Sequence, residues 1–476
     1  MSKPSGSMAR ARLSPLAASI ATLFALATPF AAPLAHADVQ VLNCNDTGAG
    51  SLRAAIATAV DGDTVDASQL ECSTISLHIG AIAIAQDNLR LVGPGRAALV
   101  VDGNDQSPVI THAGSGTLDI EGLSLTHGYA TAPNATLNNT IGGGCLLSFG
   151  TLTLDDVAVS HCEAHSSNKY AAMGGAIFAA GDLSLHDSIV SDSVADASEG
   201  NAPASGGGIA VAGDLTMVAS EIRDNTASGI GIGGGVFVGS SANIADSTIA
   251  GNLAHQGGGI AVTGFGSGDP TQFNLVNSTV SGNRASGVVG GVALSLSSSS
   301  SVRIEHSTIA FNTATATIIA QQSTAPLAPG LVVFSQDASM PATLEGTLIA
   351  NNTYDAPTPG DPAIEYDFSS YQATLDGSHN LVVASNSALP VDTIIGTCAR
   401  LGPLLDNGGP TRTHALLPGS VAIDAGASDD GGLDHDQRGA PFPRLSGAAT
   451  DIGAFEVWQG DSIFANGFDI AVDPCT

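Results

Sequence analysis

The chain has 476 residues, too many for one compact core but suited to an elongated fold that grows by repetition. Asp and Glu outnumber Lys and Arg by 44 to 14, which gives a formal net charge of −30. A surface this acidic repels the phosphates of nucleic acids and anionic lipids, so the charge argues against nucleic-acid binding. The 43% of apolar residues argues equally against a disordered acidic chain.

Residues 1–37 have the three parts of a secretory signal peptide. Three basic residues precede a largely apolar stretch, and Ala35-His36-Ala37 matches the small-x-small cleavage pattern. A retained membrane anchor is the alternative, but two prolines interrupt the apolar stretch and it is short for a span. We therefore expect an exported protein, secreted or held at the outer cell surface or outer membrane, with no membrane span after cleavage.

Residues 38–116 are expected to form an N-terminal cap and the first coils of a repetitive fold. The stretch from Leu52 to Val60 has the apolar spacing of a short helix. A helix at this place would cover the open edge of the first coil, which otherwise invites aggregation.

Residues 117–395 contain eight similar segments, each with two apolar residues five positions apart. A serine or threonine precedes the second apolar residue by two positions in six segments, and an asparagine follows it by three in five segments. Glycine runs separate the segments, with starts roughly thirty residues apart, which is typical of solenoids and propellers. The asparagines are Asn225, Asn252, Asn283, Asn312 and Asn352.

These features predict an all-β fold, a single-stranded right-handed parallel β-helix with an N-terminal cap and a C-terminal closing segment. One unit cannot bury its apolar face alone, whereas units stacked at a rise of about 4.8 Å bury it together. The five asparagines would then stack and hydrogen-bond from coil to coil as a structural ladder. A β-propeller is the alternative, but its blades commonly carry aromatic signatures, and only 4% of this chain is aromatic.

The repeats resemble those of bacterial outer-membrane and secreted β-helix proteins, in which a Gly-Gly-Ala/Ile mark alternates with a Phe-x-x-Asn mark. Ile309-Ala-Phe-Asn312 shows the second mark, with Ile in place of Phe. The stretch Ser51-Leu-Arg-Ala-Ala-Ile56 is similar to the opening of such proteins, with Ala54 where Glu is usual.

Residues 396–458 resemble the choice-of-anchor Q domain, which closes β-helix proteins before a surface-sorting tail. The resemblance rests on Leu401-Gly-Pro-Leu-Leu, His414-Ala-Leu-Leu-Pro-Gly-Ser420, Ile423-Asp-Ala-Gly426, Asp436-Gln-Arg-Gly439 and Asp451-Ile-Gly-Ala-Phe-Glu456, in that order. This resemblance implies where the protein is located and no particular chemistry. Residues 459–476 form a C-terminal tail, of which 461–469 resemble a tail of exported proteobacterial proteins.

The charged residues of these motifs predict a network that fastens the closing segment over the open end of the solenoid. Arg438 is the expected hub, because one guanidinium has five donors and can bridge two carboxylates. The predicted members are Asp424, Asp436, Arg438, Asp451 and Glu456.

One acidic loop suggests an ion. Asp429, Asp430, Asp434 and Asp436 place four carboxylates in eight residues with glycines between them, and calcium favours such flexible, oxygen-rich loops. A solvated turn, or salt links to Arg438 and Arg444, is the alternative. Calcium is the only cofactor that the sequence suggests.

The cysteines predict three disulfides, because their number is even and an exported protein is oxidised. Nearness in the sequence favours three pairs: Cys44 with Cys72, Cys145 with Cys162, and Cys398 with Cys475.

No motif assigns a catalytic residue, so the catalytic set is unknown. We expect a β-helical binding or structural protein, similar to an adhesin, whose partner is a polysaccharide or a ligand on a host or cell surface. The alternative is a polysaccharide lyase or glycoside hydrolase that acts along one face of the helix. A cleft that holds Arg or Lys against two or more acids would favour the enzyme.

Overall fold

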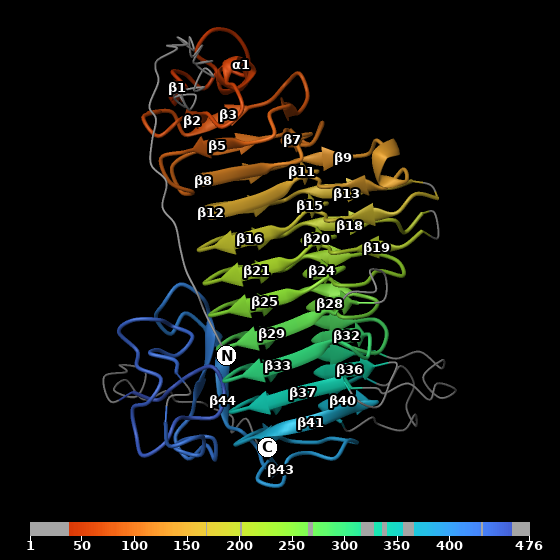
Figure 1. Cartoon of the computed structure of the whole chain (residues 1–476), viewed down its shortest axis with the longest axis vertical. Coiled ribbons are helices and arrows are strands. Elements are labelled where there is room, and N and C mark those ends of the chain that lie inside the picture. The colour runs from red at the N-terminus through yellow and green to blue at the C-terminus, as the bar shows by residue number, and fades with distance from the viewer. Residues whose placement is uncertain are drawn as a thin grey trace, which may run out of the picture. The chain divides into compact units, whose positions relative to one another are not determined.

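The computed structural model describes residues 38–167, 169–199, 202–264, 270–315, 328–335, 340–355, 366–429 and 432–458. All of them belong to one compact unit, Ala37–Thr476. The predicted fold is confirmed: these residues form a right-handed parallel β-helix whose strands pair with equivalent strands of the next coil (Figure 1). The predicted signal peptide, residues 1–37, lies outside the described residues.

The largest sheet, here called the long sheet, has 22 strands. In chain order they are β1 (Asp38–Gln40), β2 (Thr64–Asp66), β3 (Thr74–Ser76), β5 (Leu89–Val92), β6 (Val100–Asp102), β8 (Thr117–Thr126), β12 (Thr151–Ser160), β16 (Leu183–His186), β17 (Ile189–Ser191), β21 (Leu215–Val218), β22 (Glu221–Arg223), β25 (Ala242–Ala245), β26 (Thr248–Ala250), β29 (Gln272–Val276), β30 (Thr279–Ser281), β33 (Ser301–Glu305), β34 (Thr308–Ala310), β37 (Met340–Glu345), β38 (Leu348–Ala350), β41 (Ala373–Ser378), β42 (Leu381–Val382) and β43 (Ile394–Ile395).

Two further parallel sheets complete the coils, with ten and eight strands. The ten-stranded sheet contains β4 (Ile82–Ile84), β7 (Ile110–His112), β11 (Leu146–Ser148), β15 (Ile177–Ala179), β20 (Ile209–Val211), β24 (Val236–Val238), β28 (Ile260–Thr263), β32 (Val292–Leu296), β36 (Leu331–Ser335) and β40 (Phe368–Tyr371). The eight-stranded sheet contains β9 (Tyr129–Ala130), β13 (Glu163–His165), β18 (Val194–Asp196), β23 (Thr226–Ala227), β27 (Leu253–Ala254), β31 (Arg284–Ala285), β35 (Thr313–Ala314) and β39 (Thr353–Tyr354).

The small elements are β10 (Ile141–Gly142), β14 (Ala172–Met173) and β19 (Ala204–Ser205), which form a three-stranded sheet, and the 3-10 helix η1 (Ala135–Leu137). Within one coil the chain runs from the ten-stranded sheet through two successive strands of the long sheet to the eight-stranded sheet, as β15, β16, β17 and β18 do. Inward side chains of equivalent strands stack in columns, as Leu154, Leu185 and Met217 do. These columns form one continuous apolar core.

The five asparagines stack at the bend between the long and the eight-stranded sheets. The Nδ2 atom of each of the first four donates to Oδ1 of the next, over 2.9 to 3.0 Å. The same Oδ1 atoms accept from backbone N–H groups of the preceding coil. The ladder ends on Asp367, whose carboxylate accepts from Asn352. Burial raises the pKa of Asp367 to about 6.

The glycine runs lie against this ladder. A Cβ atom on Gly208 would approach Nδ2 of Asn225 to 2.9 Å, and one on Gly259 would approach Nδ2 of Asn283 equally closely. Any larger residue would push the asparagine out of register. Glycine is therefore required here for close packing, while Gly206, with φ of 65°, meets the requirement for a left-handed turn.

The N-terminal end is closed by helix α1 (Leu52–Thr58), within the predicted span. Its N-cap Ser51 accepts from the N–H of Ala54, and its face of Leu52, Ala55 and Ile56 is buried. Among the described residues no helix is long and apolar enough to cross a lipid bilayer.

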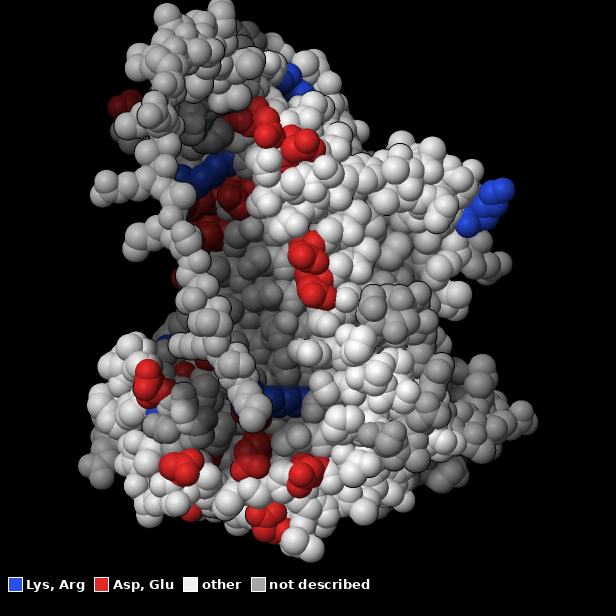
Figure 2. All heavy atoms as spheres, in the orientation of Figure 1, with Lys and Arg blue, Asp and Glu red and all other residues white. Residues whose placement is uncertain are grey.

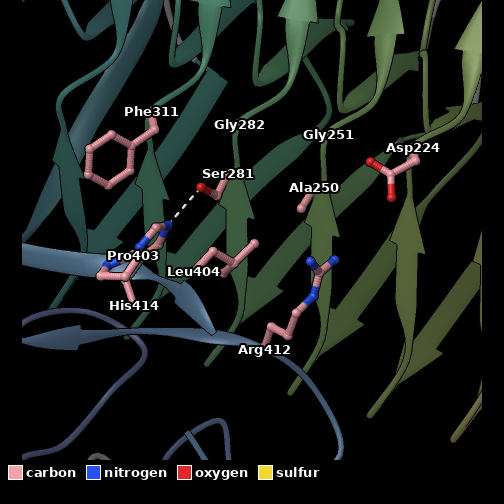
Figure 3. A pocket seen from close by; sticks show the side chains of 10 residues that line it. All are labelled: Asp224, Ala250, Gly251, Ser281, Gly282, Phe311, Pro403, Leu404, Arg412 and His414. Carbon is pink, nitrogen blue, oxygen red and sulfur yellow. Dashed lines mark hydrogen bonds between the residues drawn. The ribbon is translucent and has the colours of Figure 1, made fainter. Parts of the chain in front are cut away.

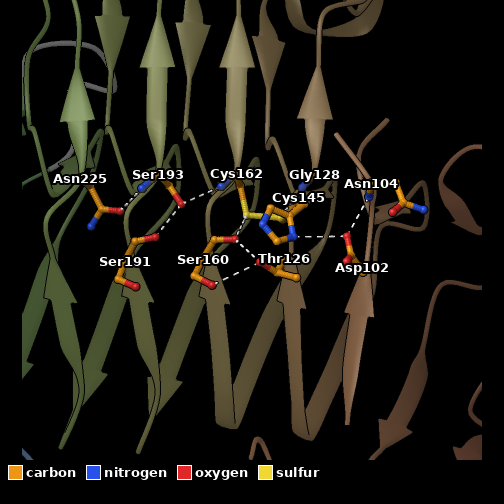
Figure 4. Close-up of a disulfide and its surroundings, with 11 residues drawn as sticks. Asp102, Asn104, Thr126, Gly128, Cys145, Ser160, Cys162, Ser191, Ser193 and Asn225 are labelled. Carbon is orange, nitrogen blue, oxygen red and sulfur yellow. Dashed lines mark hydrogen bonds and ion pairs between the residues drawn. A yellow bond between two sulfur atoms is a disulfide. The ribbon is translucent and has the colours of Figure 1, made fainter. Parts of the chain in front are cut away.

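Two predicted disulfides are confirmed, Cys44–Cys72 and Cys145–Cys162. Figure 4 shows the second of them. Their Cα atoms are 6.3 and 5.5 Å apart. Cys398 is also disulfide-bonded. Cys475 lies outside the described residues, so the third pairing stays a prediction.

The closing segment, residues 396–458, lies along the side of the solenoid and not over its open end, which corrects the expectation (Figure 1). Its hairpin of β44 (Leu401–Leu405) and β45 (Thr413–Leu416) is antiparallel. Its hydrogen bonds run from Glu221 in β22 to Gly346 just before β38, and its apolar side chains cluster with Leu348, Ala350 and Leu381. The physical reason is the outward face of these short strands. Its Thr and Ser hydroxyls hydrogen-bond the segment, and its outward apolar side chains form a buried cluster with Leu401, Leu416 and Ile452 of the segment.

We predict that Asn283→Ala lowers the free energy of unfolding by about 1–3 kcal/mol, because it leaves the buried backbone N–H of Asn252 without an acceptor and its Nδ2 with the Ile222 carbonyl alone. The measurement is chemical unfolding followed by circular dichroism. Asn243→Ala, at an exposed position of the long sheet, is the matched control. Equal effects of the two substitutions would contradict a structural role for the ladder.

Candidate functional site

One outer face of the long sheet is polar along ten consecutive strands. Parallel pairing places one outward side chain of each strand in a single column, here called the polar face. Its members are Arg90, Asp119, Thr153, Ser184, Thr216, Asn243, Asn274, Arg303, Thr343 and Asp376. All ten are exposed or half-buried. At the usual strand spacing the column is about 40 Å long.

The middle of the polar face is uncharged and rich in hydrogen-bonding groups. Five successive members, from Thr153 to Asn274, are Thr, Ser or Asn. Asn274 donates through Nδ2 to Oδ1 of Asn243 over 2.6 Å, which orders this pair. Figure 2 shows a mainly uncharged surface in the middle of this side, interrupted by a few acidic side chains. The arrangement can offer a polymer a regular row of hydroxyl and amide groups.

A small charged cluster borders the polar face. His186 Nδ1 lies 3.0 Å from Oδ1 of Asp155 and 3.5 Å from Oδ2 of Asp187. The hydrogen bond to Asp155 is the main reason why the pKa of His186 is raised. All three side chains are substantially exposed, so water competes for this cluster.

A second feature is the junction pocket, which lies between the hairpin β44–β45 and the coils beneath it (Figure 3). Its volume is about 460 Å³. The coils contribute Asp224, Ser281 and Phe311, and the hairpin region contributes Leu404, Arg412 and His414, as Figure 3 shows.

Arginines and acids meet at one edge of this pocket. Glu221, nearly buried, lies 3.1 Å from Nε of Arg412 and 3.7 Å from Nε of Arg223. Arg223 is also 3.1 Å from Asp224 and 3.8 Å from Asp192. This is the combination of a basic group with several acids that we expected of a polysaccharide-cleaving enzyme.

Ser281 and His414 form a buried pair in the same pocket. His414 Nδ1 is 2.7 Å from the carbonyl oxygen of Gly402 and must donate to it, so Nε2 accepts from the Ser281 hydroxyl, also over 2.7 Å. Burial lowers the pKa of His414 to about 4, which makes it a weak base at neutral pH. The pair therefore fastens the hairpin to the coils. The two residues are 133 positions apart, so sequence reasoning had no signal for it.

The structure brings all five predicted network residues together. Arg438 pairs with the carboxylate of Asp436, whereas the carboxylate of Glu456 binds other partners. Arg438 donates to both oxygens of Asp436 and to the carbonyl oxygen of Glu456. Its guanidinium lies 3.8 Å from the ring centroid of Phe455 and 3.9 Å from that of Phe442. Hydrogen bonds link Asp424 to Asp451, and Asp451 to Glu456, through backbone N–H groups.

Arg444 is a second arginine at the centre of this network. From the sequence we expected it only as a possible salt-link partner of the acidic loop. It is fully buried and donates to the Glu456 carboxylate over 2.9 Å. It also binds the Asn277 side chain, which ties the network to the coils. The sequence did offer one indication of this role: Arg444 follows Arg438 by six residues in a segment with few other cations.

The described members of the predicted calcium set, Asp429, Asp434 and Asp436, do not bring their carboxylate oxygens together as a group of metal ligands. Asp436 is fully buried and both of its oxygens accept from Arg438, whereas Asp429 and Asp434 are exposed. Asp430 lies outside the described residues. Calcium binding by this loop stays a prediction.

We predict that the closing network loses stability as the pH rises from about 4 to 7. Burial raises the pKa of Asp451 to about 6 and that of Glu456 to about 7. Carboxyls raised above their unfolded values stabilise the fold while protonated and lose that contribution as the pH passes through the folded pKa. Thermal unfolding across this range measures the effect. Glu456→Gln should flatten the slope, and an unchanged slope would contradict the assignment.

Comparisons with known proteins show only a distant structural likeness. No protein-family model matches the chain, and no curated protein matches it. A crystal structure of pectate lyase Pel9A aligns over 89% of this chain and 97% of its own, with 12% sequence identity and a TM-score of 0.43. A likeness at this level carries no argument about function, and the choice-of-anchor Q domain remains a resemblance in sequence.

Proposed function

We propose that this is an exported β-helical binding protein that holds an extended, uncharged polymer, such as a neutral polysaccharide, along the polar face. The observation that carries the proposal is the row of five uncharged hydrogen-bonding side chains from Thr153 to Asn274. Sugar hydroxyls can both donate to and accept from such groups, and a row on successive strands suits a repetitive ligand. Because the side chains are regularly spaced, the free energies of many weak contacts can add along one polysaccharide molecule.

The charge of the protein supports an uncharged ligand. The formal net charge of −30 repels polyanions, while the two arginines and two aspartates of the polar face balance one another. The disulfides Cys44–Cys72 and Cys145–Cys162 support the proposed export, because such bonds persist in oxidising compartments. An adhesin-like position at the cell surface is proposed on the same ground and on the sequence of residues 396–458.

Binding to neutral polysaccharides tests the proposal. The mature chain should be retained by one or more of them in affinity electrophoresis. Thr216→Glu, which places a bulky charge in the middle of the row, should weaken binding at least tenfold, about 1.4 kcal/mol.

The matched control is Thr353→Glu on the eight-stranded sheet, where the side chain is also exposed. It should bind as the natural protein does. Equal binding of the Thr216→Glu variant, or retention by no neutral polysaccharide, would overturn the proposal.

A polysaccharide-cleaving enzyme is the second candidate, favoured by Arg223 and Arg412 around Glu221 at the edge of the junction pocket. Opposed charges of this kind can neutralise a substrate group and move a proton. If the pocket is catalytic, Glu221→Gln should reduce the release of new chain ends at least a hundredfold. Arg284→Ala, which removes an exposed arginine of the eight-stranded sheet, is the control. Absence of any cleavage product with the natural protein would exclude this candidate.

A further inference from the structure

Three potential metal ligands converge on the outer face of the eight-stranded sheet. Glu163 and His165 are outward residues of β13, and Asp196 pairs directly with His165 in the parallel register with β18. The Nδ1 atom of His165 is 3.2 Å from Oε1 of Glu163 and 3.3 Å from Oδ2 of Asp196. The side chains of His165 and Asp196 are largely shielded from solvent, whereas that of Glu163 is 38% exposed.

The imidazole nitrogen at the centre of this group is buried and makes no hydrogen bond. The two carboxylate oxygens are near enough, but neither lies in a direction that a hydrogen bond to the ring nitrogen requires. Buried polar atoms are normally satisfied, so an exception needs a physical explanation. Atoms that converge without bonding one another can be satisfied together by a shared cation.

The distances suit a small transition-metal ion. A tetrahedral ion with bonds of about 2.0–2.1 Å holds neighbouring ligand atoms about 3.3 Å apart. The two contacts of His165 Nδ1, 3.2 and 3.3 Å, match this separation. Calcium is a poorer fit, because it takes about six to eight oxygen ligands at longer distances and seldom a nitrogen.

Neighbouring groups hold two of the ligands in place. The N–H of Ser198 donates to Oδ1 of Asp196 over 3.0 Å, which leaves Oδ2 directed at His165. The ring of Tyr129 stacks on His165, with centroids 6.0 Å apart and planes 22° from parallel. Such outer contacts orient metal ligands and reduce the entropy lost on binding.

We propose that Glu163, His165 and Asp196 bind one divalent transition-metal ion of the Zn²⁺ class, through Oε1, Nδ1 and Oδ2 respectively. Three protein ligands leave a fourth position for water or for an oxygen of a bound molecule. Glu163 and Tyr129 also line a pocket of about 420 Å³ beside the Cys145–Cys162 disulfide, where such a molecule can approach. The site is independent of the polar face, which belongs to another sheet.

Titration of the metal-free mature chain with Co²⁺ tests the proposal, because Co²⁺ at such a site absorbs visible light. We expect saturation at one equivalent and displacement by an equal amount of Zn²⁺. Glu163→Gln and His165→Asn should each weaken Co²⁺ binding at least tenfold. His255→Ala is the control, because His255 lies further along the same side of the solenoid beside Ser286 and should leave binding unchanged.

The metal-free variants should melt at the same temperature as the metal-free natural protein, which separates ligand loss from misfolding. A variant that melts lower would be replaced by Asp196→Asn, for which the same loss is expected. Absence of Co²⁺ binding, or equal binding by the Glu163→Gln and His165→Asn variants, would overturn the proposal. So would displacement of Co²⁺ by an equal amount of Ca²⁺.

Discussion

The β-helix depends on satisfying the buried polar groups at the bend where each coil leaves the long sheet. The asparagine ladder does this with one residue per coil: each Oδ1 accepts from the backbone and the side chain of the preceding coil, and each Nδ2 donates to the next. Glycines on the adjoining turn let the chain approach the ladder closely. Because the ladder sets the register at the bend in the coils from Asn225 to Asn352, it also sets the register of the outward side chains in those coils, among them Thr216, Asn243 and Asn274 of the polar face.

The sequence was sufficient to predict the solenoid, the cap helix and two disulfides, because each depends on a local or strictly periodic pattern. The path of residues 396–458 was mispredicted, since contacts such as Ser281 with His414 join residues 133 positions apart and follow no period. The role of Arg444 was missed for the same reason. Glu163, His165 and Asp196 were not singled out, because they come together only when strand register places β13 beside β18.

Structural support and the proposed recognition lie on different surfaces. The closing segment packs on the outward side chains of the short strands from β22 to β38 and buries Arg438 and Arg444 with their acids. The neighbouring column of the long sheet keeps its hydroxyl and amide side chains accessible. Substitutions in the closing network are therefore expected to change stability, and substitutions on the polar face to change binding.

Hydroxyl-radical footprinting with a bound neutral polysaccharide tests the central claim most directly. Val218 and Val276 lie on the outer face of the long sheet, two residues from Thr216 and Asn274, and Phe311 and Leu404 line the junction pocket. Our account predicts that the polysaccharide protects the two valines from oxidation and leaves Phe311 and Leu404 unchanged. Protection of Phe311 and Leu404 with unprotected valines would place the ligand in the junction pocket and contradict the account.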